Sequence, residues 1–176
     1  MKTSSSADEP VFKGMHWGMS MEDVRAVERS QEWGSNDEAI GYSSVEMDWG
    51  GEELRDLFNK TYVIYFFDAR GLCKIQFPTN CIIGDAETAA HMFGLARAHL
   101  SRIFGEPAMV DEAKKVAEWR TAVTTVTVRV DEEYDGPDEM GLFGFHYDYP
   151  AEHYNNRVPE RYLRVIYRST NVSGRH

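Results

Sequence analysis

The fold is decided by the stretch Phe12-Lys13-Gly14-Met15-His16-Trp17-Gly18-Met19-Ser20-Met21-Glu22-Asp23-Val24, which joins an aromatic entry segment to a helix start. Ser20 is a suitable N-cap, because its hydroxyl can accept a backbone N–H of the first helical turn. Asp23 lies three residues later, where the acid of a capping box belongs. Gly14 and Gly18 allow the chain to bend before the helix, and we expect Trp17 to anchor that bend on a sheet. The stretch therefore predicts structure rather than catalysis.

Hydrophobic periodicity predicts helix, three strands, helix, three strands. The helices are expected over 21–33 and 85–105, the second with Asp85 as its N-cap and Gly105 at its end. Strands joined by short hairpins favour an α+β fold, in which an antiparallel sheet of about six strands carries both helices on one face. The expected strands are 40–49, 61–67, 72–77, 118–132, 142–149 and 162–168.

Two of the strand regions carry local signals. The segment Asp68-Ala69-Arg70-Gly71 predicts a hairpin turn, because glycine readily adopts positive φ. In the strand 118–132 the apolar positions change parity, with Trp119 on one parity and Val126 on the other. This change predicts a bulge or bend near Thr124–Thr125.

The composition predicts a single domain over residues 12–170 of the 176-residue chain, between a flexible polar arm (1–11) and a flexible tail (171–176). The formal net charge of −10 argues against nucleic-acid binding. No run approaches 18 apolar residues, which argues against membrane insertion. Cys73 and Cys81 are too few for a disulfide scaffold. We therefore expect free thiols and a cytoplasmic location, unless a leader peptide has been removed.

Several short motifs resemble a pattern of uncharacterised bacterial proteins. These motifs are Phe12, Gly14, Trp17-Gly18-Met19-Ser20, Glu22 and Val24, then Phe104-Gly105-Glu106-Pro107, Trp119, and Leu163-Arg164-Val165-Ile166-Tyr167. The helix start also resembles repeats of β-lactamase-inhibitory-protein-like proteins and of small outer-membrane-assembly lipoproteins. A lipidated cysteine near the start and a proline after the first helix belong to the lipoprotein pattern but do not occur here. The resemblance implies a protein-binding scaffold with an aromatic sheet face, and no catalytic residues.

The acidic segment 131–139 is the first candidate binding site. It contains six acids in nine residues, but Leu142 stands where a calcium-binding loop requires glutamate. We therefore expect it to bind a basic partner protein, together with Tyr147 and Tyr149 of an aromatic strand face. The C-terminal arginines are expected to balance the acidic loops. The six acids are Asp131, Glu132, Glu133, Asp135, Asp138 and Glu139, and the arginines are Arg157, Arg161, Arg164, Arg168 and Arg175.

A metal site is the alternative, and its candidate ligands are His146, Asp148, Glu152 and His153. They lack a defined metal-binding spacing such as His-Glu-x-x-His. His91 and His99 are eight residues apart, whereas two ligands on one helix are typically four apart.

The sequence contains no Gly-x-Gly-x-x-Gly, Walker, Gly-x-Ser-x-Gly or Cys-x-x-Cys motif. Cys73 alternates into a strand, which favours a core thiol over a nucleophile. We therefore predict a protein-binding module without catalytic activity or cofactor, such as an immunity or inhibitor protein that neutralises a basic partner. The alternatives are a metal-binding or hydrolytic protein that uses the 146–153 cluster, and a component of envelope assembly.

Overall fold

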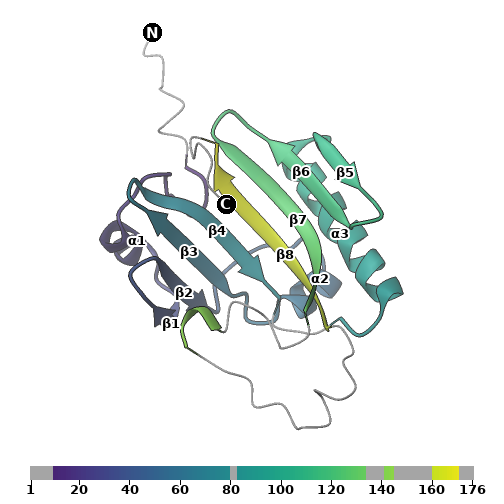
Figure 1. Cartoon of the computed structure of the whole chain (residues 1–176), viewed down its shortest axis with the longest axis horizontal. Helices are drawn as coiled ribbons and strands as arrows, with labels where there is room; N and C mark the ends of the chain where they lie inside the picture. The colour runs from purple at the N-terminus through teal and green to yellow at the C-terminus, as the bar shows by residue number, and fades with distance from the viewer. Residues whose placement is uncertain (1–9, 80–82, 134–140, 145–159, 171–176) are drawn as a thin grey trace.

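The computed structural model describes residues 10–79, 83–133, 141–144 and 160–170. In this part of the chain, eight strands form one antiparallel sheet in the order β1-β2-β3-β4-β8-β7-β6-β5 (Figure 1). Three helices of the same described residues accompany the sheet. The elements in chain order are α1 (Met21–Val27), β1 (Gln31–Ser35), β2 (Ala39–Ser43), α2 (Glu52–Leu57), β3 (Val63–Asp68), β4 (Gly71–Pro78), α3 (Ala86–Phe104), β5 (Met109–Asp111), β6 (Val116–Arg120), β7 (Thr124–Glu133) and β8 (Glu160–Ser169).

The α+β class and the antiparallel sheet are confirmed, but the predicted number and order of the elements are wrong. Within the described residues the sheet has eight strands instead of about six, and the helices number three instead of two. Two elements are too short for periodicity to reveal, since α2 has six residues and β5 has three. The other differences concern a predicted helix that ends early, a predicted strand that divides into two, and two predicted strands that are wrong in part.

The first helix ends at Val27 rather than at residue 33, and Glu28 is the reason. The Glu28 carboxylate accepts the backbone N–H groups of Arg29 and Ser30, each at 3.0 Å. These donors are thereby withdrawn from the helical pattern, and Glu28 itself has extended backbone with φ −72° and ψ 125°. The chain can then continue into β1, which pairs with β2.

The predicted bulge within 118–132 is a complete reversal of the chain between β6 and β7. The N–H of Thr121 donates to the carbonyl of Thr124 at 2.8 Å. The Thr121 hydroxyl oxygen accepts the N–H groups of Val123 and Thr124 at 3.3 and 3.0 Å. The turn residues Ala122 and Val123 are not typical turn formers, so the change of parity was its only signal in the sequence.

Two other predicted strands are also wrong in part. The strand expected over 40–49 leaves the sheet after Ser43, where Ser44 has a φ of +60°. The strand expected over 142–149 begins in a turn, because the N–H of Gly144 donates to the carbonyl of Gly141 at 3.1 Å. The remainder of that predicted strand lies outside the described residues.

All three helices contribute to one hydrophobic core. In Figure 1, α2 and α3 lie behind the sheet, and Val24 of α1 joins the same cluster of buried side chains. The α3 prediction is confirmed, including its Asp85 cap and its apolar face. We call the opposite side of the sheet the outer face. The buried apolar residues of α3 are Ala89, Phe93, Ala96 and Leu100.

The opening stretch is fastened to the β3–β4 hairpin. The N–H of Gly18 donates to the carbonyl of Leu72 at 2.9 Å, and the N–H of Leu72 donates to the carbonyl of Met19 at 2.8 Å. At the predicted hairpin turn, Gly71 has a φ of +100°, and a Cβ there would lie 2.3 Å from the Gly18 carbonyl oxygen. Only glycine fits this close approach of two backbone segments.

The predicted roles of Ser20 and Trp17 are confirmed. Ser20 caps α1 in a complete capping box with Asp23, and hydrogen bonds from Ser20 lower the pKa of the Asp23 carboxyl. The indole Nε1 of Trp17 donates to Oγ1 of Thr124 at 2.9 Å, which ties the bend to the start of β7. The opening stretch is therefore structural, as its sequence predicts.

The variant Trp17→Phe is expected to lower the free energy of unfolding by about 1 kcal/mol, because it removes the hydrogen bond to Thr124 and keeps an aromatic ring at this position. Urea unfolding of Trp17→Phe, Thr124→Val and the double variant would measure the coupling between the two residues. We expect the double variant to lose less than the sum of the single losses. Additive losses would show that this hydrogen bond does not stabilise the protein.

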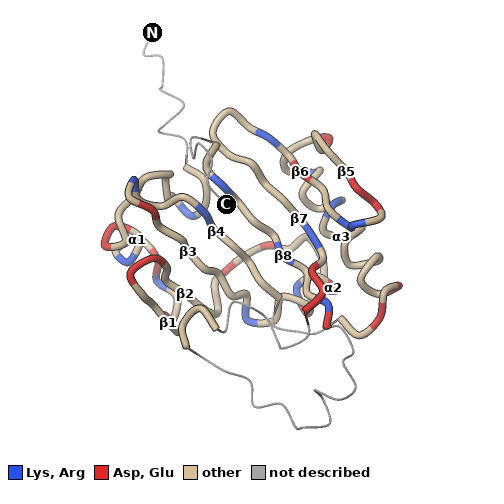
Figure 2. The backbone as a smooth tube through the Cα atoms, viewed as in Figure 1, with Lys and Arg blue, Asp and Glu red and all other residues tan. Residues whose placement is uncertain are grey.

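Within the described residues, none of the helices is both long and apolar enough to cross a membrane. Figure 2 shows Lys and Arg residues on the central strands β4, β8 and β7 as well as at the periphery. Positive charge on the central strands is unexpected for a chain with 29 acidic and 19 basic residues.

Candidate functional site

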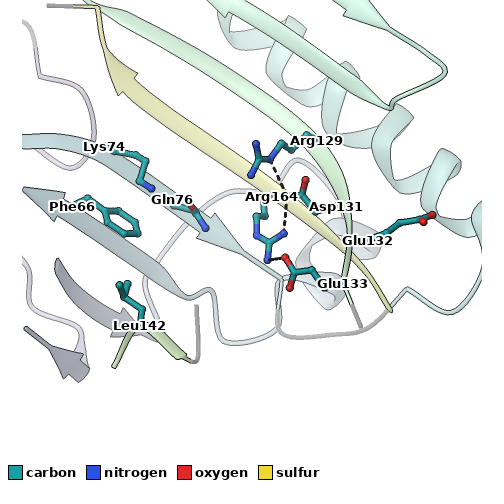
Figure 3. Close-up of a pocket in the computed structure, with 9 residues that line it drawn as sticks. All are labelled: Phe66, Lys74, Gln76, Arg129, Asp131, Glu132, Glu133, Leu142 and Arg164. Carbon is teal, nitrogen blue, oxygen red and sulfur yellow. Dashed lines mark hydrogen bonds and ion pairs between the residues drawn. The ribbon is translucent and has the colours of Figure 1, made fainter. Parts of the chain in front are cut away.

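The outer face of the sheet contains a groove with a volume of about 480 Å³. Successive side chains of a strand point to opposite faces, so the strand neighbours of the core residues Ile75, Val128 and Val165 point to the outer face. Phe66 and Leu142 lie on one side of the groove together with Lys74 and Gln76, and the arginines and acids of β7 and β8 lie on the other (Figure 3). The lining residues are Phe66, Lys74, Gln76, Arg129, Asp131, Glu132, Glu133, Leu142 and Arg164.

Arg164 of β8 is the centre of the charged side. Its Nη1 donates to Oδ2 of Asp131 at 2.6 Å, and its Nη2 lies 2.5 Å from Oε1 of Glu133. The same Asp131 oxygen accepts Nε of Arg129 at 2.9 Å. Only 3% of the Arg164 side chain is exposed. Such short ionic hydrogen bonds hold the guanidinium group in one orientation (Figure 3).

Glu132 belongs to a separate pair. Its carboxylate accepts Nε of Arg161 at 3.0 Å, and Figure 3 shows the side chain pointing away from the Arg164 group. Alternation along β7 explains this orientation, because Glu132 lies between two residues that face the groove. Glu132 therefore contributes to the border of the groove and not to its centre.

Lys74 and Phe66 form the opposite side of the groove. They are direct partners in the β3–β4 register, and Nζ of Lys74 lies 3.5 Å from the centroid of the Phe66 ring. A cation over a ring face is attracted by the electrons of the ring. Lys74 is half-buried and so is restricted in the directions it can take.

An aromatic cluster continues the outer face beyond the groove. Trp33 packs edge-to-face on Phe143, with ring centroids 4.8 Å apart, and on Tyr62 at 5.9 Å. Gly41 of β2 makes room for Trp33, since a Cβ at this position would lie 2.6 Å from the indole. The outer face thus combines aromatic rings on β1–β3 with charged groups on β4, β8 and β7.

The acidic segment predicted from the sequence is only partly described. Asp131, Glu132 and Glu133 lie on β7, and each has an arginine partner. The prediction that C-terminal arginines balance acids is confirmed for Arg161 and Arg164. The predicted partner-binding residues Asp135, Asp138, Glu139, Tyr147 and Tyr149 lie outside the described residues.

The alternative metal ligands His146, Asp148, Glu152 and His153 also lie outside the described residues, so that site stays a prediction. Among the residues that the structure does describe, no group of three or more His, Cys, Asp or Glu side chains is arranged to hold a metal ion. His91 pairs with Glu53 at 2.7 Å, while His99 is buried in α3, where burial lowers its pKa.

Cys73 is a half-buried thiol at the β4 end nearest the hairpin turn. Its Sγ donates to the carbonyl of Phe66 at 3.4 Å. Burial, helped by the negative charge of Asp68, raises the pKa of the Cys73 thiol. A raised pKa disfavours the nucleophilic thiolate, in agreement with the structural role predicted for this residue.

Sequence reasoning did not identify Lys74, Arg129 and Arg164 as site residues. Lys74 and Gln76 do alternate with the apolar residues of their strand, which placed them on one face together. The missing information was the neighbouring strand, because β8 lies between β4 and β7 although it comes last in the chain.

The groups in the groove are suited to recognition by charge and ring contacts. Its cations are arginine and lysine, which bind carboxylate and phosphate groups. No protein-family model matches this chain, and comparison with curated proteins and with solved structures gave no significant match.

Proposed function

We propose that this protein is a non-enzymatic binding protein that holds a partner protein on the outer face of its sheet. The supporting observation is the groove, in which Arg164 is held by Asp131 and Glu133 next to the Lys74–Phe66 pair. Ion pairs that fix these side chains in advance reduce the entropy lost on binding. The inhibitor or immunity role expected from the sequence would use this face in the same way.

The residue types of the outer face support the same proposal. Tryptophan, tyrosine and arginine contribute most of the energy at protein interfaces, and the outer face has Trp33 and Tyr62 beside the arginines of β7 and β8. The three helices of the described residues pack on the other face, so the core does not depend on the exposed side chains of the outer face, whereas the buried Arg164 is part of the fold itself. The protein can therefore tolerate changes at the exposed positions of the outer face.

Affinity capture from an extract of the source organism would test the proposal with two matched variants. Arg129→Ala removes an outer-face arginine that pairs with Asp131, and Asp131 keeps Arg164 as a partner. Arg55→Ala removes an exposed arginine of α2 that pairs with Asp56 at 3.4 Å. We expect the wild type and Arg55→Ala to retain the same partner, and Arg129→Ala to retain at least about tenfold less.

Equal retention by both variants would contradict the use of the outer face. Failure of the wild type to retain any partner would contradict the binding function itself. Circular dichroism of each variant before capture would exclude unfolding as the cause of a loss.

A further inference from the structure

Between β2 and β3 the chain leaves the sheet for residues 46–60, which we call the flap. Two backbone hydrogen bonds join its ends: the N–H of Ser44 donates to the carbonyl of Lys60 at 2.5 Å, and the N–H of Val45 donates to the carbonyl of Thr61 at 3.2 Å. Ser44, Lys60 and Thr61 all have positive φ, which is uncommon for residues other than glycine. Such backbone is typical of switch regions, so the ends of the flap have the features of a hinge.

The flap packs largely on itself. Trp49 stacks on Phe58 with ring centroids 3.8 Å apart, and its Nε1 donates to Oγ1 of Thr61 at 3.0 Å. Trp49 also contacts Phe77 of β4 edge-to-face at 5.8 Å. Because much of this contact is internal, the flap can move as one unit and uncover part of the core. Its buried apolar residues are Val45 at the hinge, then Trp49, Leu54, Leu57 and Phe58.

His99 of α3 lies directly against the flap. The residue is only 7% exposed. Gly50 of the flap has a φ of +75°, and a Cβ there would overlap Nδ1 of His99 and lie 2.7 Å from Nη2 of Arg102. The ring hydrogen-bonds to the backbone of Asp48, whereas Nε2 is buried without a hydrogen-bond partner among the described residues. Nδ1 therefore makes the bond to the flap, and Nε2 is an unused acceptor.

This arrangement suits only a neutral ring. Protonation would place an N–H donor without an acceptor, and a positive charge, in a buried site. The charged groups that act on the ring are Arg102, about one turn along α3, and Asp48 of the flap. Burial first, and then the charge of Arg102, lower the pKa of His99, while Asp48 acts in the opposite direction. The charges of α2 are engaged with one another or with His91, since Glu53 pairs with His91 and Arg55 pairs with Glu52 and Asp56.

We propose that the flap is an acid-sensitive lid: protonation of His99 releases residues 46–60 from α3 and uncovers the apolar core beneath them. A histidine whose pKa is lowered in the closed state stabilises that state fully above its unfolded pKa of about 6.5, and this contribution is lost as the pH falls. The helix α2 lies behind the sheet in Figure 1, so this opening is separate from the binding proposed for the outer face.

Amide hydrogen exchange of the wild type at pH 7.5 and 5.5 tests the proposal, because histidine is the side chain that ordinarily titrates in this interval. Arg55 and Phe58 are the probes, since their N–H groups donate to carbonyls within the flap at 3.1 and 2.9 Å. After correction for the intrinsic pH dependence, we expect protection at these amides to fall by up to about tenfold. Leu72 reports on the sheet, where its N–H donates to Met19, and is expected to keep its protection.

Three variants assign the effect to His99. His99→Asn cannot be protonated, but its amide can still bond to the Asp48 backbone, so we expect protection that no longer changes with pH. His91→Asn is the matched control, because His91 is an exposed histidine of the same helix, and we expect it to behave as the wild type does. Arg102→Gln removes an exposed cation that disfavours protonation of the ring in the closed flap, so we expect a smaller fall.

Each contrary result has a distinct meaning. A change of less than about twofold at Arg55 and Phe58 in the wild type would overturn the proposal. An equal fall at Leu72 would mean that the whole fold loosens and that the flap is not a separate unit. A full fall in His99→Asn, or its loss in His91→Asn, would assign the effect to another group. If His99→Asn does not fold, Arg102→Gln decides, and a fall as large as that of the wild type would overturn the assignment to His99.

Discussion

The variant Glu28→Ala is expected to lower the free energy of unfolding by about 3–5 kcal/mol, which is the range for breaking a buried ionic group away from its partners. The Glu28 side chain has no exposed surface. It accepts the Tyr65 hydroxyl at 2.8 Å and lies 3.2 Å from the Lys13 ammonium group. Urea unfolding followed by tryptophan fluorescence would measure the loss.

The size of the effect follows from the number of donors that Glu28 satisfies. Besides Tyr65 and Lys13, the carboxylate accepts the N–H groups of Arg29 and Ser30. Removal leaves these donors without that acceptor, and an unsatisfied buried polar group is costly. The same contacts end α1, so the variant also removes the reason for the chain to turn into β1.

The loss is expected to depend on pH. Burial acts to raise the pKa of Glu28, but hydrogen bonds from Ser30, Tyr65 and Lys13 outweigh it, and the pKa is lowered. A carboxyl with a lowered pKa in the folded state stabilises the fold above its unfolded pKa of about 4.3 and loses that contribution as the pH falls through its folded pKa. The difference between wild type and Glu28→Ala should therefore be largest near pH 6 and smallest near pH 3.

Glu22→Ala is the matched control, because Glu22 is an exposed acid of the same helix. We expect it to change the free energy of unfolding by less than about 1 kcal/mol. A loss below about 1 kcal/mol for Glu28→Ala, or a loss independent of pH, would contradict the role assigned to Glu28.

The variant Arg164→Met is expected to lower the free energy of unfolding by about 3–5 kcal/mol, because it leaves Asp131 and Glu133 without their shared buried cation. Methionine keeps much of the volume of the aliphatic stem, so lost charge is the main change. Chemical unfolding would measure the effect. Because the fold depends on it, Arg164 is unsuitable for the binding tests above.

Arg161→Met is the control on the same strand. Arg161 pairs with Glu132, whose side chain is 54% exposed, so water can solvate the acid that is left behind. We expect a loss of about 1 kcal/mol or less. The triple variant Arg164→Met, Asp131→Asn, Glu133→Gln should recover at least half of the Arg164→Met loss, since the stranded charges are gone. No recovery would show that packing, and not charge, is what Arg164 supplies.

Much of the local structure was predictable, because the signals lie within a few residues of one another. Ser20 with Asp23, Asp85 at the start of α3, and the Asp68–Gly71 turn all formed as predicted. Each depends on the conformation or hydrogen bonding of its own segment. The alternation of Lys74 with apolar residues was also predicted correctly, because it is a property of one strand alone.

The errors lie where particular hydrogen bonds, from a distant residue or from an untypical turn, override the periodic pattern. Residues 28–33 have helical character, but Glu28 is held by Tyr65 and Lys13, so the chain extends there. The reversal at Thr121–Thr124 lacks turn-forming residues and is made by threonine hydrogen bonds. Neither outcome can be read from periodicity, which averages over a window of neighbouring residues.

The sequence by itself determined the caps, the α3 helix, the central hairpin and the α+β class, because these follow from contacts over short separations. Only the tertiary structure decided the strand order and the candidate site. The placement of β8 between β4 and β7 brings Lys74 opposite Arg168 and Arg164 beside Asp131. That register comes from long-range pairing of strands around a shared core, and no local pattern specifies which strands become neighbours.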